Sequence, residues 1–145
     1  MKMSGRIVFD TGALVGAVLR PGSMAERAFS LALGEGVVCA CEPTLERLHT
    51  TLSRRSFDRY MGRRARLDFV ELLRRNAWIC AISASDVAAL QPSCRIRRDN
   101  VFLALAAAAE ARLIVAGSPN LLARNPWHGI AIASPEEFLV LVERA

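Results

Sequence analysis

Short apolar runs alternate with longer amphipathic stretches along most of the chain. The short runs are typical of buried strands, and the longer stretches place apolar residues at helical spacing. Strands are predicted at Arg6 to Phe9, Val37 to Cys41, Trp78 to Ile82, Arg112 to Ala116 and Ile130 to Ala133. Helices are predicted at Ala13 to Leu19, Ser23 to Leu33, Glu42 to Arg54, Arg64 to Asn76, Asp99 to Ala111 and Pro135 to Arg144.

This alternation of strands and helices predicts the fold class. Two neighbouring parallel strands need a connection that crosses back over the sheet, and this connection is usually a helix. Strands that alternate with helices are therefore expected to pair in parallel. We therefore expect an α/β three-layer sandwich in which a central, mostly parallel five-stranded sheet has helices on both faces. The sequence shows no linker, internal repeat or low-complexity tract, so residues 1–145 are expected to form a single domain.

Composition adds expectations about location and cysteine chemistry. Hydrophobic residues make up 52% of the chain, but charges interrupt every apolar stretch before it reaches the roughly 20 residues that span a bilayer. The apolar run before Asp10 is too short for a signal peptide, so we expect a cytoplasmic protein with no membrane partner. Cys39, Cys41, Cys80 and Cys94 match neither paired zinc ligands nor a disulfide framework, and are expected to be buried thiols.

The net charge of +5 is carried almost entirely by arginine, because Lys2 is the only lysine. A phosphate-binding loop or a Schiff-base enzyme needs an internal lysine, so both are excluded. The arginines gather in two segments, which contain Arg54, Arg55, Arg59, Arg63, Arg64 and Arg66, and Arg95, Arg97 and Arg98. Guanidinium clusters favour a nucleic acid as partner; a solvated helix face and an acidic protein partner are the alternatives.

Asp10 is the strongest candidate for a functional residue, because it directly follows the apolar run Ile7 to Phe9. In a parallel α/β sheet, ligands and catalytic groups collect outside the carboxyl ends of the strands. Asp99 begins a predicted helix, and Glu42 and Glu46 lie on the first turns of the helix after the second strand, so each can face the same crevice. The alternative is that these acids only cap helices or favour helix N-termini.

Five segments together carry a family resemblance. They are Ile7 to Thr11, Pro43 to Phe57, Cys94 to Ala106, Leu113 to Leu122 and Pro135 to Leu139. In this order they resemble the PIN-domain family, and within it the VapC-like toxin components of bacterial toxin–antitoxin pairs. The resemblance implies Mg²⁺- or Mn²⁺-dependent hydrolysis of RNA, a homodimer and a small antitoxin partner.

The resemblance also assigns roles to residues of this chain. Asp10 and Asp99 correspond to metal-binding catalytic acids, and Glu46 is the candidate for a third catalytic acid. Several carboxylates suit this chemistry, because a divalent cation takes oxygen ligands, polarises the scissile phosphate and activates a bound water. The residues expected to contact substrate are Thr11, Arg47, Arg98, Asn100, Ser118 and Asn120.

The sequence departs from the family pattern at several acidic positions. Arg47 stands where relatives usually have glutamate, and Glu46 is displaced by one residue, which is a rotation of about 100° on a helix. Ser118 and Asn120 replace aspartates after Gly117. We therefore expect at most one weakly held Mg²⁺ or Mn²⁺ and weak or absent hydrolysis. If Arg47 enters the crevice, its guanidinium can pair with Asp10 and occupy the place of the metal's charge, which disfavours a cation.

Two other functions compete with that of a weakened ribonuclease. A non-catalytic PIN scaffold that binds RNA or a protein partner is nearly as well supported. A phosphatase with Asp10 as its covalent nucleophile is disfavoured, because Gly12 stands where a second aspartate is needed. Arg54, Arg55, Arg59, Arg63 and Arg98 are expected to form a positive rim around the site. The aromatic residues are candidates for stacking platforms or interface anchors, although such residues more often lie in the core; they are Trp78, Trp127, Tyr60 and the phenylalanines.

Overall fold

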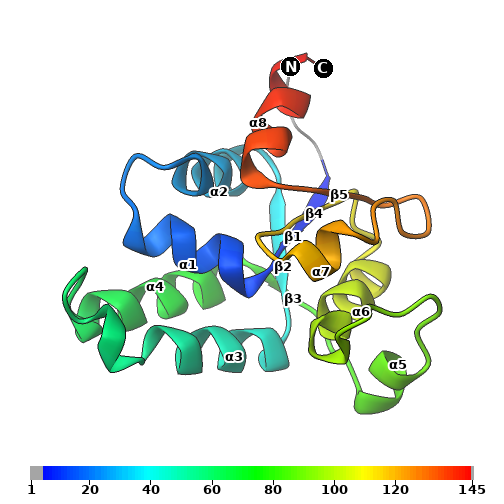
Figure 1. Cartoon of the computed structure of the whole chain (residues 1–145), viewed down its shortest axis with the longest axis horizontal. Coiled ribbons are helices and arrows are strands. Elements are labelled where there is room, and N and C mark those ends of the chain that lie inside the picture. The colour runs from blue at the N-terminus through cyan, green and yellow to red at the C-terminus, as the bar shows by residue number, and fades with distance from the viewer. Residues whose placement is uncertain (1–4, 145) are drawn as a thin grey trace.

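The computed structural model describes residues 5–144, and a five-stranded parallel sheet lies at its centre (Figure 1). The strand order is β3-β2-β1-β4-β5, and every neighbouring pair is parallel. The strands are β1 (Arg6–Phe9), β2 (Val37–Ala40), β3 (Trp78–Ile79), β4 (Leu113–Val115) and β5 (Ala131–Ala133). The predicted α/β fold class is confirmed, and the sheet is parallel throughout.

Helices connect the strands and follow the last of them. The α-helices are α1 (Thr11–Leu19), α2 (Met24–Glu35), α3 (Glu42–Leu52), α4 (Arg63–Asn76), α5 (Ala84–Ala88), α6 (Asn100–Ala109), α7 (Pro119–Leu122) and α8 (Pro135–Arg144). Two 3-10 turns, η1 (Arg55–Phe57) and η2 (Arg97–Asp99), precede α4 and α6. None of the helices within residues 5–144 is long and apolar enough to cross a membrane.

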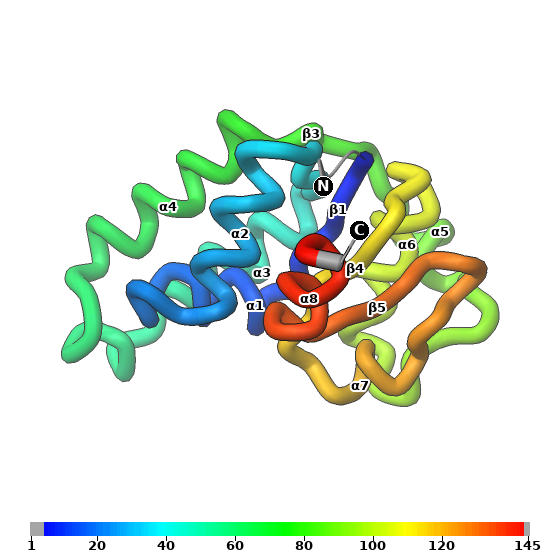
Figure 2. The backbone as a smooth tube through the Cα atoms, turned by 90° about the horizontal axis from the view of Figure 1, so that it is seen from above, coloured from blue at the N-terminus to red at the C-terminus, as the bar shows by residue number. Residues whose placement is uncertain are grey.

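The sheet separates two layers of helices, which Figure 2 shows from above: α1 to α4 and α8 lie on one side, and α5 to α7 on the other. The β1 strand shows how the sequence produces this arrangement. Ile7 and Phe9 pack into the core beneath the first layer, whereas Val8 packs into the core beneath α6. Successive side chains of a strand point to opposite faces, so an uninterrupted apolar run serves a sheet that is covered on both sides.

Three local predictions need correction. The third strand ends at Ile79 instead of Ile82, because after the bond from Cys80 N–H to Ala40 O the chain leaves the sheet for α5. The helices α5 and α7 were not predicted, since five and four residues are too few to show a helical period.

The cysteines largely meet expectation. Cys39, Cys41 and Cys94 are buried free thiols, and Cys80 is a half-buried one. Burial raises the pKa of the Cys39 thiol to about 11, so at neutral pH this group remains protonated and behaves as part of the apolar core.

The helices α3 and α4 form a long hairpin that projects from the sheet. They pack side by side, and their connection lies at the far left of Figure 1. Eleven residues of α3 carry the chain about 16 Å from the end of β2, at 1.5 Å per residue. The connection between α3 and α4 is therefore remote from the carboxyl edge of the sheet, where α3 begins.

Candidate functional site

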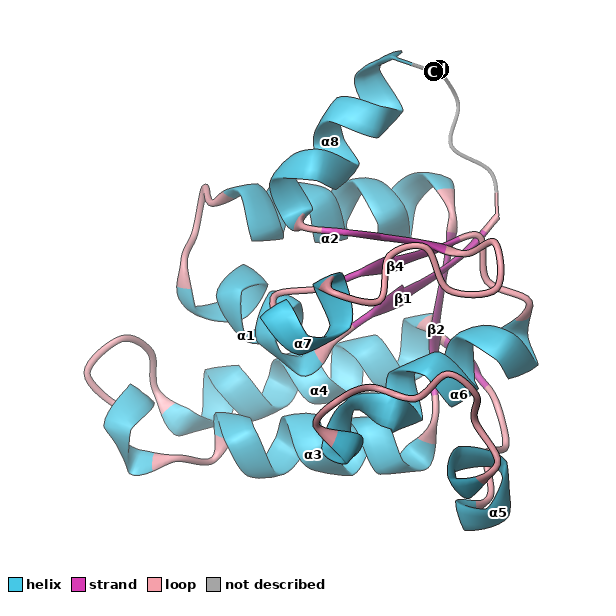
Figure 3. Ribbon diagram, turned by 45° about the vertical axis from the view of Figure 1, so that its right-hand side comes forward, coloured by secondary structure: helices cyan, strands magenta, loops and turns pink. Residues whose placement is uncertain are grey.

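Asp10 follows β1 at the carboxyl edge of the sheet and is 2% exposed. Its carboxylate caps α1 by accepting the N–H of Ala13 at 2.8 Å. It also accepts the N–H groups of Gly117 at 2.9 Å and Ser118 at 3.0 Å, across the gap between α1 and the start of α7 (Figure 3). Asp10 thus both caps α1 and lies at the carboxyl edge of the sheet.

The environment of Asp10 acts on its protonation in opposing ways. Burial raises the pKa of the carboxyl above its ordinary value, because the charged form loses solvation. The three backbone hydrogen bonds counter this rise, whereas the negative charge of Asp99 adds to it. The net pKa is raised, so ionised Asp10 is held at an energetic cost.

Gly117 allows the two parts of this arrangement to meet. A Cβ atom at this position would lie 3.2 Å from the Ala13 nitrogen and 3.3 Å from the Gly12 carbonyl carbon. Such contacts with backbone are tighter than usual, and backbone cannot move aside as a flexible side chain can. The glycine therefore brings the N–H groups of residues 117 and 118 within reach of Asp10.

Asp99 lies at the end of η2, immediately before α6, and is 8% exposed. Its Oδ2 atom accepts hydrogen bonds from the Ser118 hydroxyl at 2.9 Å and from the Asn120 amide at 3.0 Å. The Asn120 side chain also bonds both backbone groups of Ile96. Ser118 and Asn120, which the sequence resemblance places where aspartates were expected, therefore act here as donors toward Asp99.

Arg47 projects from α3 and stands beside Asp99. Its Nη1 atom lies 3.6 Å from the Asp99 Oδ1 atom, and its Nη2 atom donates to the Arg98 carbonyl oxygen. The guanidinium carbon lies 5.3 Å from the centre of the Phe102 ring, within cation–π distance. The predicted pairing with Asp10 is wrong: among the described residues, the acid paired with Arg47 is Asp99. Asp10 is already occupied by three backbone donors.

A cavity of about 750 Å³ joins these groups. The predicted residues that line it are Asp10, Thr11, Glu46, Arg47, Arg98, Asp99 and Ser118. Both Glu46 and Arg47 reach the cavity, so the displacement by one residue does not turn either of them away. Asn120 lies behind Asp99 and does not line it. Asn100 is buried elsewhere, with its side-chain oxygen accepting the Cys94 N–H at 2.7 Å.

Some lining residues were not identified from the sequence. Thr50 and Thr51 follow Arg47 by three and four residues, and Phe102 lies one turn into α6. Helical spacing from Arg47 would have found the two threonines, because residues three and four apart share a face. The Thr11 hydroxyl, although expected at the site, has a further property: it is buried and has no hydrogen-bond partner within residues 5–144. Its hydrogen-bonding capacity is therefore unused within the described part of the chain.

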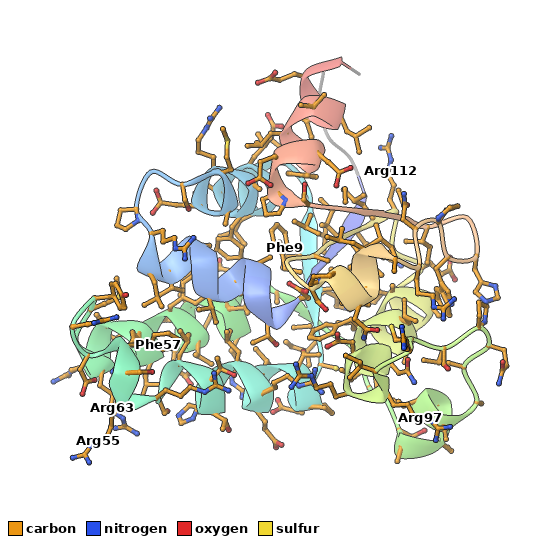
Figure 4. The ribbon with its side chains drawn as sticks, in the orientation of Figure 1. Phe9, Arg55, Phe57, Arg63, Arg97 and Arg112 are labelled. Atoms are coloured by element: carbon orange, nitrogen blue, oxygen red, sulfur yellow. The ribbon has the colours of Figure 1, made fainter. Side chains whose placement is uncertain are left out.

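Glu42 and the arginine rim are placed differently from the expectation. Glu42 is exposed and pairs with Arg74 of α4, which lowers the pKa of its carboxyl. Arg54 and Arg98 line the cavity. Figure 4 shows Arg55 and Arg63 at the far end of the α3–α4 hairpin, so the five arginines do not form one rim. The reason is the length of α3, which carries the later arginines away from the sheet edge.

The donor set does not fit a divalent cation in this arrangement. Residues 5–144 contain no group of three or more His, Cys, Asp or Glu side chains placed to hold a metal ion. Asp10 accepts three hydrogen bonds, and Asp99 accepts two and faces a guanidinium. Mg²⁺ keeps several waters and needs only one or two protein carboxylates, but a cation here would have to displace the donors that both carboxylates already have.

Comparisons with known proteins agree with the fold. The family model of the PIN domain matches residues 6–118. Among solved structures, a chain from the crystal structure of VapBC2 from Rickettsia felis, bound to a DNA fragment from the promoter, is similar with a TM-score of 0.62 and 15% identity. The match covers 89% of this chain and 98% of that chain. No curated protein sequence matches significantly. Because the family model spans most of the chain, this protein belongs to the PIN domain family.

Proposed function

We propose that the cavity lined by Asp10, Arg47 and Asp99, called the cleft from here on, binds the phosphate groups of RNA and hydrolyses RNA weakly or not at all. The PIN domain and the likeness to a VapC-type structure support a ribonuclease ancestry. Family members of this type generally use Mg²⁺ or Mn²⁺. The observation that carries the proposal is the placement of the Arg47 guanidinium against Asp99.

Arg47 supplies positive charge where such enzymes hold a cation. When bound, that cation polarises the scissile phosphate and lowers the pKa of a water that attacks it. A guanidinium neutralises carboxylates and binds phosphate, but it offers no coordination site for a water nucleophile. Replacing a metal with Arg47 thus preserves the electrostatic balance of the cleft and removes the main source of catalysis.

The remaining groups of the cleft are suited to hold a phosphate. Arg54 and Arg98 line the cavity together with Arg47, and both are exposed. Thr11 and Ser118, which both carry a hydroxyl, line the same cavity. A phosphodiester is recognised by guanidinium and hydroxyl donors together. An entering phosphate would take over donors of Arg47 that now face Asp99.

The test compares three proteins: the native chain, Arg47→Glu and Arg47→Gln. The glutamine variant removes the guanidinium without adding a ligand, so it separates the loss of repulsion from the gain of a carboxylate. We expect Mn²⁺ affinity, measured by calorimetry, to rise slightly in Arg47→Gln and at least about tenfold in Arg47→Glu. RNA affinity in the presence of a chelator should fall in both variants.

Cleavage assays complete this test. We expect little hydrolysis of single-stranded RNA by the native protein with Mg²⁺ or Mn²⁺, and more by a variant that combines Arg47→Glu, Ser118→Asp and Asn120→Asp. Adding Asp10→Asn to that variant should abolish the gain. Efficient cleavage by the native protein that is lost in Asp10→Asn would contradict the neutralised site and leave the family assignment intact.

We also propose that the chain forms a homodimer and pairs with a small antitoxin protein. The support is the sequence resemblance to VapC-like toxins and the fold shared with a chain of a VapBC2 complex. Light scattering of the purified protein tests the homodimer. A short upstream reading frame for a DNA-binding protein, and co-purification of its product with this chain, would test the antitoxin. A monomer that does not bind that product would contradict this proposal without affecting the cleft.

A further inference from the structure

The connection between α3 and α4 concentrates the positive charge of the protein. We call residues 53–67 the hairpin tip. It contains six arginines and one aspartate, so its formal charge of +5 equals that of the whole chain. The rest of the sequence is therefore formally neutral. The positive charge is therefore concentrated at the hairpin tip, and an anionic partner is favoured there.

A buried arginine holds the hairpin tip together and removes its only acid. Arg66 is 0% exposed, donates to the Arg54 carbonyl oxygen at 3.1 Å and forms an ion pair with Asp58. The other tip arginines, Arg54, Arg55, Arg59, Arg63 and Arg64, are all exposed. Within residues 5–144 none of these five forms an ion pair. Their charge is presented to solvent on a rigidly tied turn.

Tyr60 adds an aromatic surface to the hairpin tip. It is 58% exposed, more than the other exposed large hydrophobic residues among those described. The Arg59 guanidinium donates to the Tyr60 hydroxyl at 3.0 Å, and its carbon lies 5.0 Å from the ring centre. An exposed ring contributes little to the core. An aromatic ring beside arginines is, however, the combination with which proteins bind single-stranded nucleic acid, because bases stack on the ring and phosphates pair with the cations.

The hairpin tip is continuous with the cleft. Arg47, Thr50 and Thr51 line the cavity along one face of α3, and Arg54, which begins the turn after that helix, lines it too. A strand that leaves the cleft along this face arrives at Arg54 and then at the exposed arginines of the tip. An acidic protein could also bind exposed arginines, but continuity with the phosphate-binding cleft and the free ring of Tyr60 favour a nucleic acid.

We propose that the hairpin tip is a second RNA-binding site, which holds a single strand whose neighbouring nucleotides lie in the cleft. The arginines bind its phosphates, and Tyr60 stacks an unpaired base. The proposal rests on the proposed function, in which RNA is the ligand of the cleft. It predicts a preference for single strands over duplexes, since the bases of a duplex are not available for stacking.

The experiment measures fluorescence anisotropy of a labelled oligouridylate of about 12 nucleotides, within the range that single-strand sites cover. A chelator is present to prevent cleavage. The charge variant is Arg59→Gln with Arg63→Gln, and its matched control is Arg27→Gln with Arg75→Gln, two exposed arginines outside the tip. The stacking variant is Tyr60→Ala, and its control is Tyr60→Phe. Circular dichroism checks that each variant is folded.

We expect Tyr60→Ala to weaken binding about tenfold, and Tyr60→Phe to bind nearly as the native protein does. The charge variant should bind more weakly, and its affinity should depend less on salt, with the logarithmic slope reduced by about 1.4 for two lost phosphate contacts. The control pair should leave that slope unchanged. A duplex of the same length should bind more weakly than the single strand and should not respond to Tyr60→Ala.

The outcomes separate this proposal from the proposed function. Native protein that binds no RNA overturns both. If RNA binding is unchanged in the tip variants but reduced in Arg47→Glu, the proposal of an RNA site at the hairpin tip is wrong and the proposed function of the cleft stands. An acidic protein is then the partner expected for the tip arginines. If RNA binding falls in the tip variants but not in Arg47→Glu, the RNA site at the hairpin tip is supported and the proposal that the cleft binds RNA is wrong.

Discussion

The cleft and the hairpin tip use arginine in opposite ways. In the cleft, Arg47 faces Asp99, and each buried acid already has its donors. At the tip, five exposed arginines form no ion pair within the described part of the chain. Charges that are paired internally contribute to the folded state, whereas unpaired charges of one sign repel one another and are available to a ligand. The comparison indicates that the cleft acids support the fold, and that the tip arginines do not.

The largest effect should come from removing the carboxylate of Asp10. Asp10→Ala leaves the N–H groups of Ala13, Gly117 and Ser118 without their acceptor, and should cost about 3 kcal/mol of unfolding free energy in urea titrations. The control is Ser23→Ala, because Ser23 caps α2 with a single bond to the Glu26 N–H and should cost about 1 kcal/mol. Equal costs for the two caps would contradict the structural role of the Asp10 site.

The next largest effect concerns an exposed acid. Asp58→Ala leaves the fully buried Arg66 without its carboxylate, which should cost about 2 kcal/mol after allowance for the exposure of Asp58. Asp68→Ala, at an exposed position on α4, should change stability by less than about 0.5 kcal/mol. Similar small effects for both variants would show that the tip is not held by this ion pair.

The stability of the cleft should also depend on pH through Asp10. Its pKa is raised in the folded state, so the folded protein binds more protons than the unfolded chain between the two pKa values. Ionising Asp10 therefore lowers stability as pH rises through that window, and the penalty persists above it. Asp10→Asn, which carries no titrating carboxyl, should gain stability relative to the native protein as pH rises from about 4 to 7. Parallel stability curves for the two proteins would contradict the raised pKa.

The smallest stability effect is expected for Arg47. Its side chain is 32% exposed and its ion pair spans 3.6 Å, so Arg47→Gln should cost less than about 1 kcal/mol. Thermal unfolding with and without Mn²⁺ measures both consequences of this change. We expect Mn²⁺ to raise the melting temperature of Arg47→Gln more than that of the native protein, since the competing charge is gone. A large loss of stability would show that Arg47 is mainly structural.

Much of the fold could be predicted because strands and helices leave local signals. The runs at Ile7 to Phe9 and Leu113 to Val115 are apolar at every position, as a sheet covered on both faces requires. Shorter elements such as α5 and α7 gave no period to recognise. The family assignment rested on several weak segments in the right order, and the family model confirms it over residues 6–118.

The details of the site were less predictable, because they depend on how elements pack. Asn100 lies next to Asp99 in the sequence, yet its side chain turns inward to bind Cys94. Asn120 was expected to contact substrate and instead supports Asp99 from behind. The direction of a side chain depends on how its helix or turn is rotated in the packed fold, and the sequence alone contains no measure of that rotation.

The sequence by itself determined the parallel sheet and the place of Asp10 at its carboxyl edge, since both follow from apolar runs and from the residue that ends them. It also showed the non-acidic residues Arg47, Ser118 and Asn120, from which a weakened acidic site was predicted. Only the tertiary structure decided that Arg47 pairs with Asp99, and that the arginines extend from the cleft, through Arg54, along the hairpin tip. Such pairings join residues far apart in the chain, such as positions 47 and 99, and depend on packing distances of a few ångströms.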